Sequence, residues 1–93
     1  MRIDIEVAFS FKRQLGDDHR SLELPDASDV TEALRTFVAA NPSVRGRLFD
    51  AKGRILRHIN ALINGGNVKL RQGFETVLQD GDRLTILPPA GGG

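Results

Sequence analysis

Residues 80–93 read DGDRLTILPPAGGG, and they join a turn, a strand and a tail that ends without side chains. The DGD triplet predicts a turn, because aspartate and glycine both favour turn conformations. Residues 83–87 alternate apolar and polar side chains, which predicts a strand with one buried face. The two prolines favour an extended backbone and the glycines add little bulk, so the tail could enter a narrow channel. This stretch predicts a folded domain over residues 1–87 and a flexible tail over residues 88–93.

Two amphipathic patterns dominate the rest of the sequence. Residues 2–9 alternate polar and apolar side chains, which predicts a strand, and a turn at 14–19 leads to a second short strand at 20–24. Over residues 29–40 apolar side chains recur with the spacing of one helix face, and Asp29 or Ser28 can cap the first turn. Further strands are expected over 55–63, 68–70 and 83–87, with a loop containing one helical turn over 43–54.

These patterns predict an α+β domain in which one main helix crosses one face of a mixed sheet of about five strands. The inward positions of the helix and strands define the expected core. Its members are Ile3, Ile5, Val7, Leu22, Val30, Leu34, Phe37, Ile59, Ile63, Leu84 and Ile86.

The composition excludes several classes of function. With 13 Lys+Arg and 12 Asp+Glu the formal charge is +1, which argues against direct nucleic-acid binding, so the arginines between positions 45 and 57 are interpreted as a solvated face. There is no cysteine, which excludes disulfides, thiolate catalysis and cysteine-ligated metals. No apolar run approaches the roughly 20 residues that span a bilayer, and the start does not resemble a signal peptide. We therefore expect a cytoplasmic protein without membrane contact.

The sequence indicates no catalytic or metal site. His19 and His58 have no nucleophile or second ligand at a recognisable spacing, and the glycine clusters lack the phosphate-binding patterns. Successive side chains of a strand point to opposite faces of the sheet. Leu62 and Leu87 should therefore point away from the core, onto the exposed sheet face near the tail. Two exposed leucines there predict a docking patch for a partner protein. The alternative is that one of them packs under a loop.

The order of these elements and several short motifs resemble the ubiquitin-like β-grasp sulfur carriers, above all the molybdopterin synthase small subunit and its relatives. The motifs are the DGD turn, INALING at residues 59–65 followed by Asn67-Val68, and Pro88-Pro89 followed by two residues and Gly92-Gly93. Between the prolines and the last two glycines stand Ala90 and Gly91, where relatives often have Val-Ala. The aromatic residue that the family often carries near Leu62 or Leu87 is absent.

The resemblance implies a ubiquitin-like β-grasp fold and a carrier protein rather than an enzyme. An E1-like enzyme would adenylate the carboxylate of Gly93 with ATP, and a sulfur donor would displace AMP to leave a C-terminal thiocarboxylate. Gly92, Gly91, Pro89 and Pro88 would form the slim tail. ATP would be used by the activating enzyme, and this chain would bind no cofactor itself.

The resemblance leaves the acceptor of the sulfur open. The implied partners are the E1-like enzyme and an acceptor such as a synthase large subunit, with molybdenum cofactor biosynthesis as the first choice. A cysteine-forming intermediate and tRNA are alternative acceptors. A ubiquitin-like modifier joined to target lysines would use the same activated Gly93. A passive β-grasp interaction module would not need the glycines at all.

Overall fold

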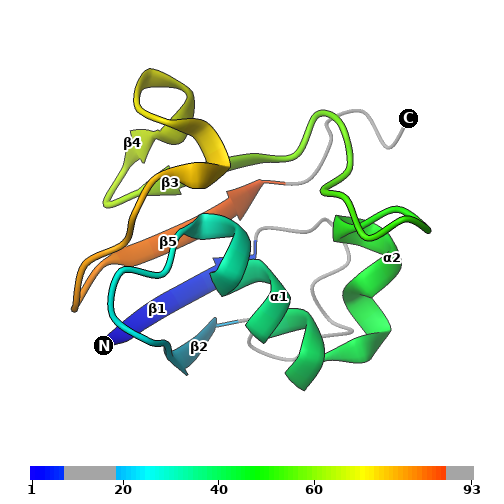
Figure 1. Ribbon diagram of the computed structural model, residues 1–93, viewed down its shortest axis with the longest axis horizontal. Coiled ribbons are helices and arrows are strands. Elements are labelled where there is room, and N and C mark those ends of the chain that lie inside the picture. Colours follow the sequence, from blue (N-terminus) through cyan, green and yellow to red (C-terminus); the bar gives the residue numbers. More distant parts are fainter. Residues whose placement is uncertain (8–18, 88–93) are drawn as a thin grey trace.

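The first strand and the last described strand of the chain lie side by side in the centre of one sheet (Figure 1). The computed structural model describes residues 1–7 and 19–87. The strands are β1 (Arg2–Val7), β2 (His19–Glu23), β3 (Asn60–Ile63), β4 (Gly66–Asn67) and β5 (Arg83–Leu87), in the spatial order β2-β1-β5-β3-β4. β1 and β5 pair in parallel, and the other neighbours are antiparallel. The predicted mixed sheet of five strands is confirmed.

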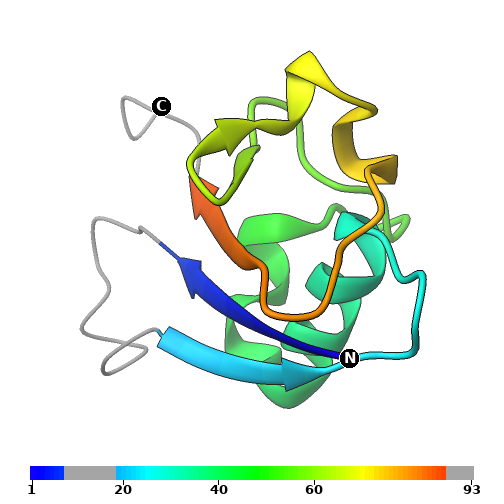
Figure 2. The ribbon, with the colours of Figure 1, turned by 90° about the vertical axis from the view of Figure 1, so that its left-hand side faces the viewer.

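The main helix, α1 (Val30–Ala40), crosses one face of this sheet (Figures 1 and 2). Of the two candidate caps, Asp29 is the one used, because its Oδ1 accepts a hydrogen bond of 2.9 Å from the backbone N–H of Glu32. The Ser28 hydroxyl donates instead to the backbone oxygen of Pro25. The helix ends at the residue before Asn41-Pro42, as the sequence predicts.

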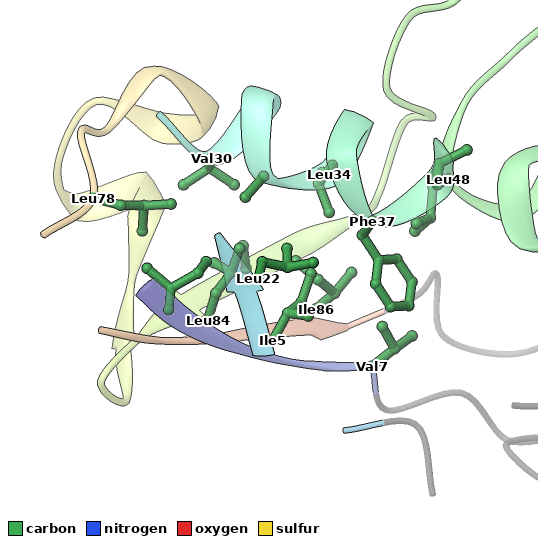
Figure 3. Packing of buried hydrophobic residues seen from close by; sticks show 14 of the residues in the cluster. Ile5, Val7, Leu22, Val30, Leu34, Phe37, Leu48, Leu78, Leu84 and Ile86 are labelled. Carbon is green, nitrogen blue, oxygen red and sulfur yellow. The ribbon is translucent and has the colours of Figure 1, made fainter. Parts of the chain in front are cut away.

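The core lies between α1 and the inner face of the sheet (Figure 3). Every residue of the predicted core is buried, so the alternation of the strands and the stripe of the helix were both interpreted in the correct register. Several buried apolar residues outside the two patterns complete the cluster. They are Val44, Leu48, Phe49, Val68 and Leu78.

The helical turn expected near residues 44–49 is present as the short helices η2 (Pro42–Val44) and α2 (Arg45–Leu48). After α2 the chain forms a small hairpin in which Phe49 bridges Ile55. The backbone N–H of Asp50 donates to the backbone oxygen of Arg54 at 2.8 Å and closes the turn. This hairpin buries Phe49 against the core while its tip faces solvent.

Two expected strands differ in the structure. Residues 55–59 are not part of the strand predicted over 55–63, which is limited to β3, and His58 has a φ of 71° that interrupts extended backbone. Residues 68–70 form the 3-10 helix η3 (Val68–Leu70) and not a strand, because Asn67 caps it by accepting from the N–H of Lys69. As a result Val68 is buried, whereas Leu70 is 87% exposed.

Another 3-10 helix, η4 (Gly73–Glu75), follows η3 and lies against α1. The hydroxyl of Thr76 is fully buried, donates to the backbone oxygen of Gly73 and accepts from the N–H of Gln72. Residues 28–30 and 76–78 are joined by two backbone hydrogen bonds, which fix the beginning of α1 against the segment that follows η4. The turn expected at 14–19 lies outside the described residues except for His19, which begins β2, and the tail at 88–93 lies outside them entirely, so the division of the chain at residue 87 stays a prediction.

Candidate functional site

The end of β5 is the point from which residues 88–93 continue. Its last residue, Leu87, pairs with Asn60 of β3, and the preceding Ile86 pairs with Ala61 of β3 and Val7 of β1. β5 is therefore held on both sides almost to its end. A central strand with two neighbours is a rigid base, so the position where the tail begins is fixed by the sheet. Gly91, Gly92 and Gly93 themselves lie outside the described residues, as do Pro88 and Pro89.

Leu62 and Leu87 lie on the sheet face that points away from α1. Burial alternates along β3 and β5, and both leucines fall on the half-buried positions of that alternation. Leu62 is directly opposite Thr85 and Leu87 is directly opposite Asn60, which makes the two leucines diagonal neighbours about 7 to 8 Å apart. The structure thus brings them together beside the start of the tail, and their role in partner binding stays a prediction.

Polar side chains surround these leucines on the same face. Across the sheet, the row through Leu62 contains Asn67 on one side and Thr85 and Glu6 on the other. Sequence reasoning did not single out these neighbours, although the alternation that selected the leucines also places Thr85 and Glu6 on that face. An apolar centre with a polar rim is the usual composition of a protein docking surface.

At the other end of β5, the DGD turn holds the first strand in place. Asp80 Oδ1 accepts from the backbone N–H of Arg2 at 2.8 Å, and the N–H of Gly81 donates to the backbone oxygen of Arg2 at 2.7 Å. Gly81 has a φ of 88°, a conformation that favours glycine. The aspartate and the glycine of the motif therefore both serve the turn, as the sequence predicts.

Asp82 and Asn64 connect this turn to the turn between β3 and β4. Asp82 Oδ1 accepts from Asn64 Nδ2 at 2.9 Å, and its Oδ2 accepts from the N–H of Gln79 at 2.8 Å. Asn64 Oδ1 in turn accepts from the N–H of Arg83 at 2.9 Å. Both side chains are used by the fold, so these polar residues are structural.

One further carboxylate, that of Asp50, has a shifted titration. The backbone N–H of Arg54 donates to its Oδ1 at 2.9 Å and lowers the pKa of this carboxyl, which partial desolvation opposes. The N–H of Lys52 and the guanidinium of Arg54 also lower the pKa, because each favours the charged form. Asp50 therefore acts as a turn-closing residue of the hairpin.

The described part of the chain contains no group of three or more His, Cys, Asp or Glu side chains that could hold a metal ion. His58 is exposed there, just before β3. None of the helices within residues 1–7 and 19–87 is both long enough and apolar enough to cross a membrane.

The geometry can be compared with known proteins. Residues 9–93 match the model of the ThiS family. The chain is 30% identical over 93 residues to small archaeal modifier protein 3 of Haloferax volcanii, which covers 100% of both proteins. It is 34% identical over 70 residues to sulfur carrier protein CysO of Mycobacterium tuberculosis, covering 72% of this chain and 75% of that protein.

Among solved structures, the crystal structure of SAMP1 from Haloferax volcanii has a TM-score of 0.85 to this chain at 25% identity, covering 100% of both chains. This likeness agrees with the strand order and with the single helix across the sheet. The match to the family model extends over most of the chain, including both sheet edges and the tail. The chain therefore belongs to the ThiS family of ubiquitin-like β-grasp proteins.

Proposed function

We propose that this protein is a sulfur carrier that holds sulfur as a thiocarboxylate on Gly93 and acts in the cytoplasm. The observation that supports the proposal best is the start of the PPAGGG segment directly after Leu87, at the end of a central strand, in a member of the ThiS family. A rigid base combined with a slim segment is suited to delivering a terminal carboxylate into the active site of another protein.

The proposed chemistry requires no catalytic group from this chain. An E1-like enzyme transfers AMP from ATP to the Gly93 carboxylate and releases pyrophosphate. Hydrosulfide, supplied by a sulfur donor, then attacks the carbonyl carbon: a C–S bond forms, the C–O bond to AMP breaks, and the proton goes to solvent. AMP is the leaving group, and no oxidant or reductant is needed. ATP belongs to the activating enzyme, so the carrier itself needs no bound cofactor.

The patch formed by Leu62 and Leu87 is the proposed docking surface for the E1-like enzyme and for the acceptor. Leu87 is the last residue before the tail, so a partner that binds the two leucines would also be close to the start of the tail. An acceptor such as a synthase large subunit, which places the sulfur in the molybdenum cofactor precursor, is our first choice. A cysteine-forming intermediate and tRNA would be served by the same thiocarboxylate.

A second candidate is a ubiquitin-like modifier that is joined to lysines of target proteins. It is favoured by the full-length match to a protein named small archaeal modifier protein 3. The activated Gly93 would then be attacked by a lysine amine instead of sulfur, with AMP again as the leaving group. Both functions can belong to one chain, because they share the adenylated intermediate.

The test is a reconstitution with ATP, the E1-like enzyme of the same host and sulfide, followed by intact-mass measurement. We expect a mass increase equal to the difference between one sulfur and one oxygen atom, located on Gly93 by fragmentation. Deleting Gly92 and Gly93 should abolish the increase and leave the unfolding temperature unchanged. Gly92→Val should impair the reaction, because a β-branched side chain widens and stiffens the tail.

A matched control is Gly46→Val, since a Cβ at Gly46 meets nothing within 4 Å. This control should react at the normal rate.

Lysine-linked peptides that end in the Gly92-Gly93 remnant, found in host cells, would support the modifier function. If the protein without Gly92 and Gly93 retains its full function in cells, the carrier and the modifier are both wrong and only a passive interaction module remains.

A further inference from the structure

A groove of about 570 Å³ lies on the helical side of the molecule, apart from the sheet face that carries Leu62 and Leu87. It is formed where the second half of α1, the proline that begins η2, the first turn of α2 and the tip of the hairpin after Phe49 meet. The residues that line it come from helices and the hairpin, not from the sheet. They are Arg35, Val38, Ala39, Pro42, Arg45, Phe49, Lys52 and Gly53.

The lining combines apolar side chains with a rim of cations. Ala39 and Pro42 are exposed and provide the apolar surface, whereas Val38 and Phe49 are buried in the core. Arg35, Arg45 and Lys52 are exposed residues from three different segments of the chain. None of the described residues that line the groove carries a carboxylate. Such a lining suits an anionic ligand that also has an apolar part.

The carboxylates nearest in sequence do little to neutralise this rim. Glu32 reaches Arg35 only at 4.0 Å, and both side chains are more than half exposed, so water screens the pair. The Asp50 carboxylate accepts from the backbone N–H groups of Lys52 and Arg54 and pairs with the Arg54 guanidinium at 3.4 Å. Asp50 thus closes the turn that presents Lys52 while its own charge is balanced by Arg54.

We propose that this groove docks an acidic peptide segment of a partner protein, with one apolar side chain between its carboxylates. The apolar residue would contact Ala39 and Pro42, which are exposed, and the flanking carboxylates would pair with Arg35, Arg45 or Lys52. The choice of a peptide over RNA follows from the lining. Phe49 is only 6% exposed and offers no stacking face, and the chain's net charge of +1 gives a weak field for a polyanion.

This docking site is independent of the chemistry at Gly93. A partner bound in the groove would leave the Leu62 and Leu87 patch open, so one protein could hold the carrier while another reacts with its tail. The inference therefore stands or fails apart from the carrier function. Binding should be the same in the protein that lacks Gly92 and Gly93.

The test is a titration of the isotope-labelled protein with blocked pentapeptides of the form Asp-Glu-Xaa-Glu-Asp, where Xaa is Leu, Ile, Phe or Met. Backbone amide signals of Val38, Ala39 and Gly53 should shift saturably with at least one peptide, and added salt should weaken binding. Arg45→Glu should weaken it by about tenfold or more, whereas Arg71→Glu, an equal charge change on η3's exposed flank, should change it by less than about twofold. If Arg45→Glu does not fold, Lys52→Glu serves the same purpose.

The control peptides replace the acids by Asn and Gln, or Xaa by Gly, and should bind at least about tenfold more weakly. The proposal is overturned if no peptide shifts these amides, if the neutral peptides bind equally well, or if the shifts cluster at Leu62 and Thr85. It is also overturned if an oligouridylate shifts the groove signals and the peptides do not. A concentration-dependent shift of the protein alone, abolished by Arg45→Glu, would assign the groove to a second copy of this chain instead.

Discussion

The two ends of β5 differ in what their neighbouring side chains do, although a glycine-containing motif adjoins each end. Where the strand begins, the side chains of Asp82 and Asn64 and the carboxylate of Asp80 are committed to hydrogen bonds within the fold. Where it finishes, Leu62 and Leu87 are half-buried apolar side chains on the outer sheet face. The charged motif is therefore structural, whereas Leu62 and Leu87 lie on the outer sheet face, where we propose that a partner binds.

The largest expected effect on stability is at the beginning of the strand. Asp82→Ala removes the acceptor of the Gln79 N–H and of Asn64 Nδ2, and should lower the free energy of unfolding by about 1.5 to 3 kcal/mol. Urea unfolding would measure it. Asp26→Ala is the control, because the Asp26 side chain is 95% exposed and contacts only the N-terminal amine, so its loss should cost less than about 0.5 kcal/mol. Equal effects of the two changes would contradict the distinction between the ends.

The opposite result is expected at the finish of the strand. Leu62→Arg should change the free energy of unfolding by less than about 1 kcal/mol, because the new charge on the outer face stays solvated. Binding to the E1-like enzyme should nevertheless weaken by about tenfold or more, as measured by calorimetry. Leu70→Arg, the same change at a leucine that is 87% exposed, should affect neither quantity. Unfolding of the Leu62 variant would place Leu62 in the core.

The smallest expected effect on stability is at Asp50, in the hairpin after α2. It tests whether an acidic side chain in a turn outside the sheet is also structural. The pKa of Asp50 is lowered from its ordinary value of 3.8, so its stabilising effect is present above that value and is lost as the pH falls through the lower pKa of the folded state. The protein should therefore be more stable than Asp50→Asn at neutral pH, and this difference should shrink in acid. Unfolding curves at several pH values would show it. A difference that does not depend on pH would assign no such role to the charge.

Strong periodicity made most of the fold predictable from the sequence. The stripe in α1 and the alternation in β1, β3 and β5 identified the buried face of each element. Short segments failed because their outcome depends on single hydrogen bonds. An apolar residue at each end of 68–70 is compatible with a strand, and only the cap by Asn67 selects the 3-10 helix. In the same way, the strand predicted over 55–63 is shorter in the structure because His58 has left-handed backbone, which the sequence pattern did not indicate.

The two candidate sites also differ in how far the sequence alone could predict them. The position of Leu62 and Leu87 on the outer face could be predicted from the alternation of side chains alone, because each residue belongs to a regular strand. The groove could not, since its cations Arg35, Arg45 and Lys52 come from three segments that meet only in the folded chain. The acceptor of the proposed sulfur transfer could not be predicted from this chain, because a partner protein would select it.

The central, parallel pairing of β1 with β5 has a consequence for biosynthesis. β1 leaves the ribosome before the other described elements and β5 leaves after them, so their pairing must wait until all of the described elements have emerged. Until then β1 lacks one neighbour, and the sheet has a gap at its middle and not at its edge. Pairing of β5 would close that gap and create the fixed base of the tail in the same step. Presentation of the tail to an activating enzyme would then be a check that the whole domain has folded.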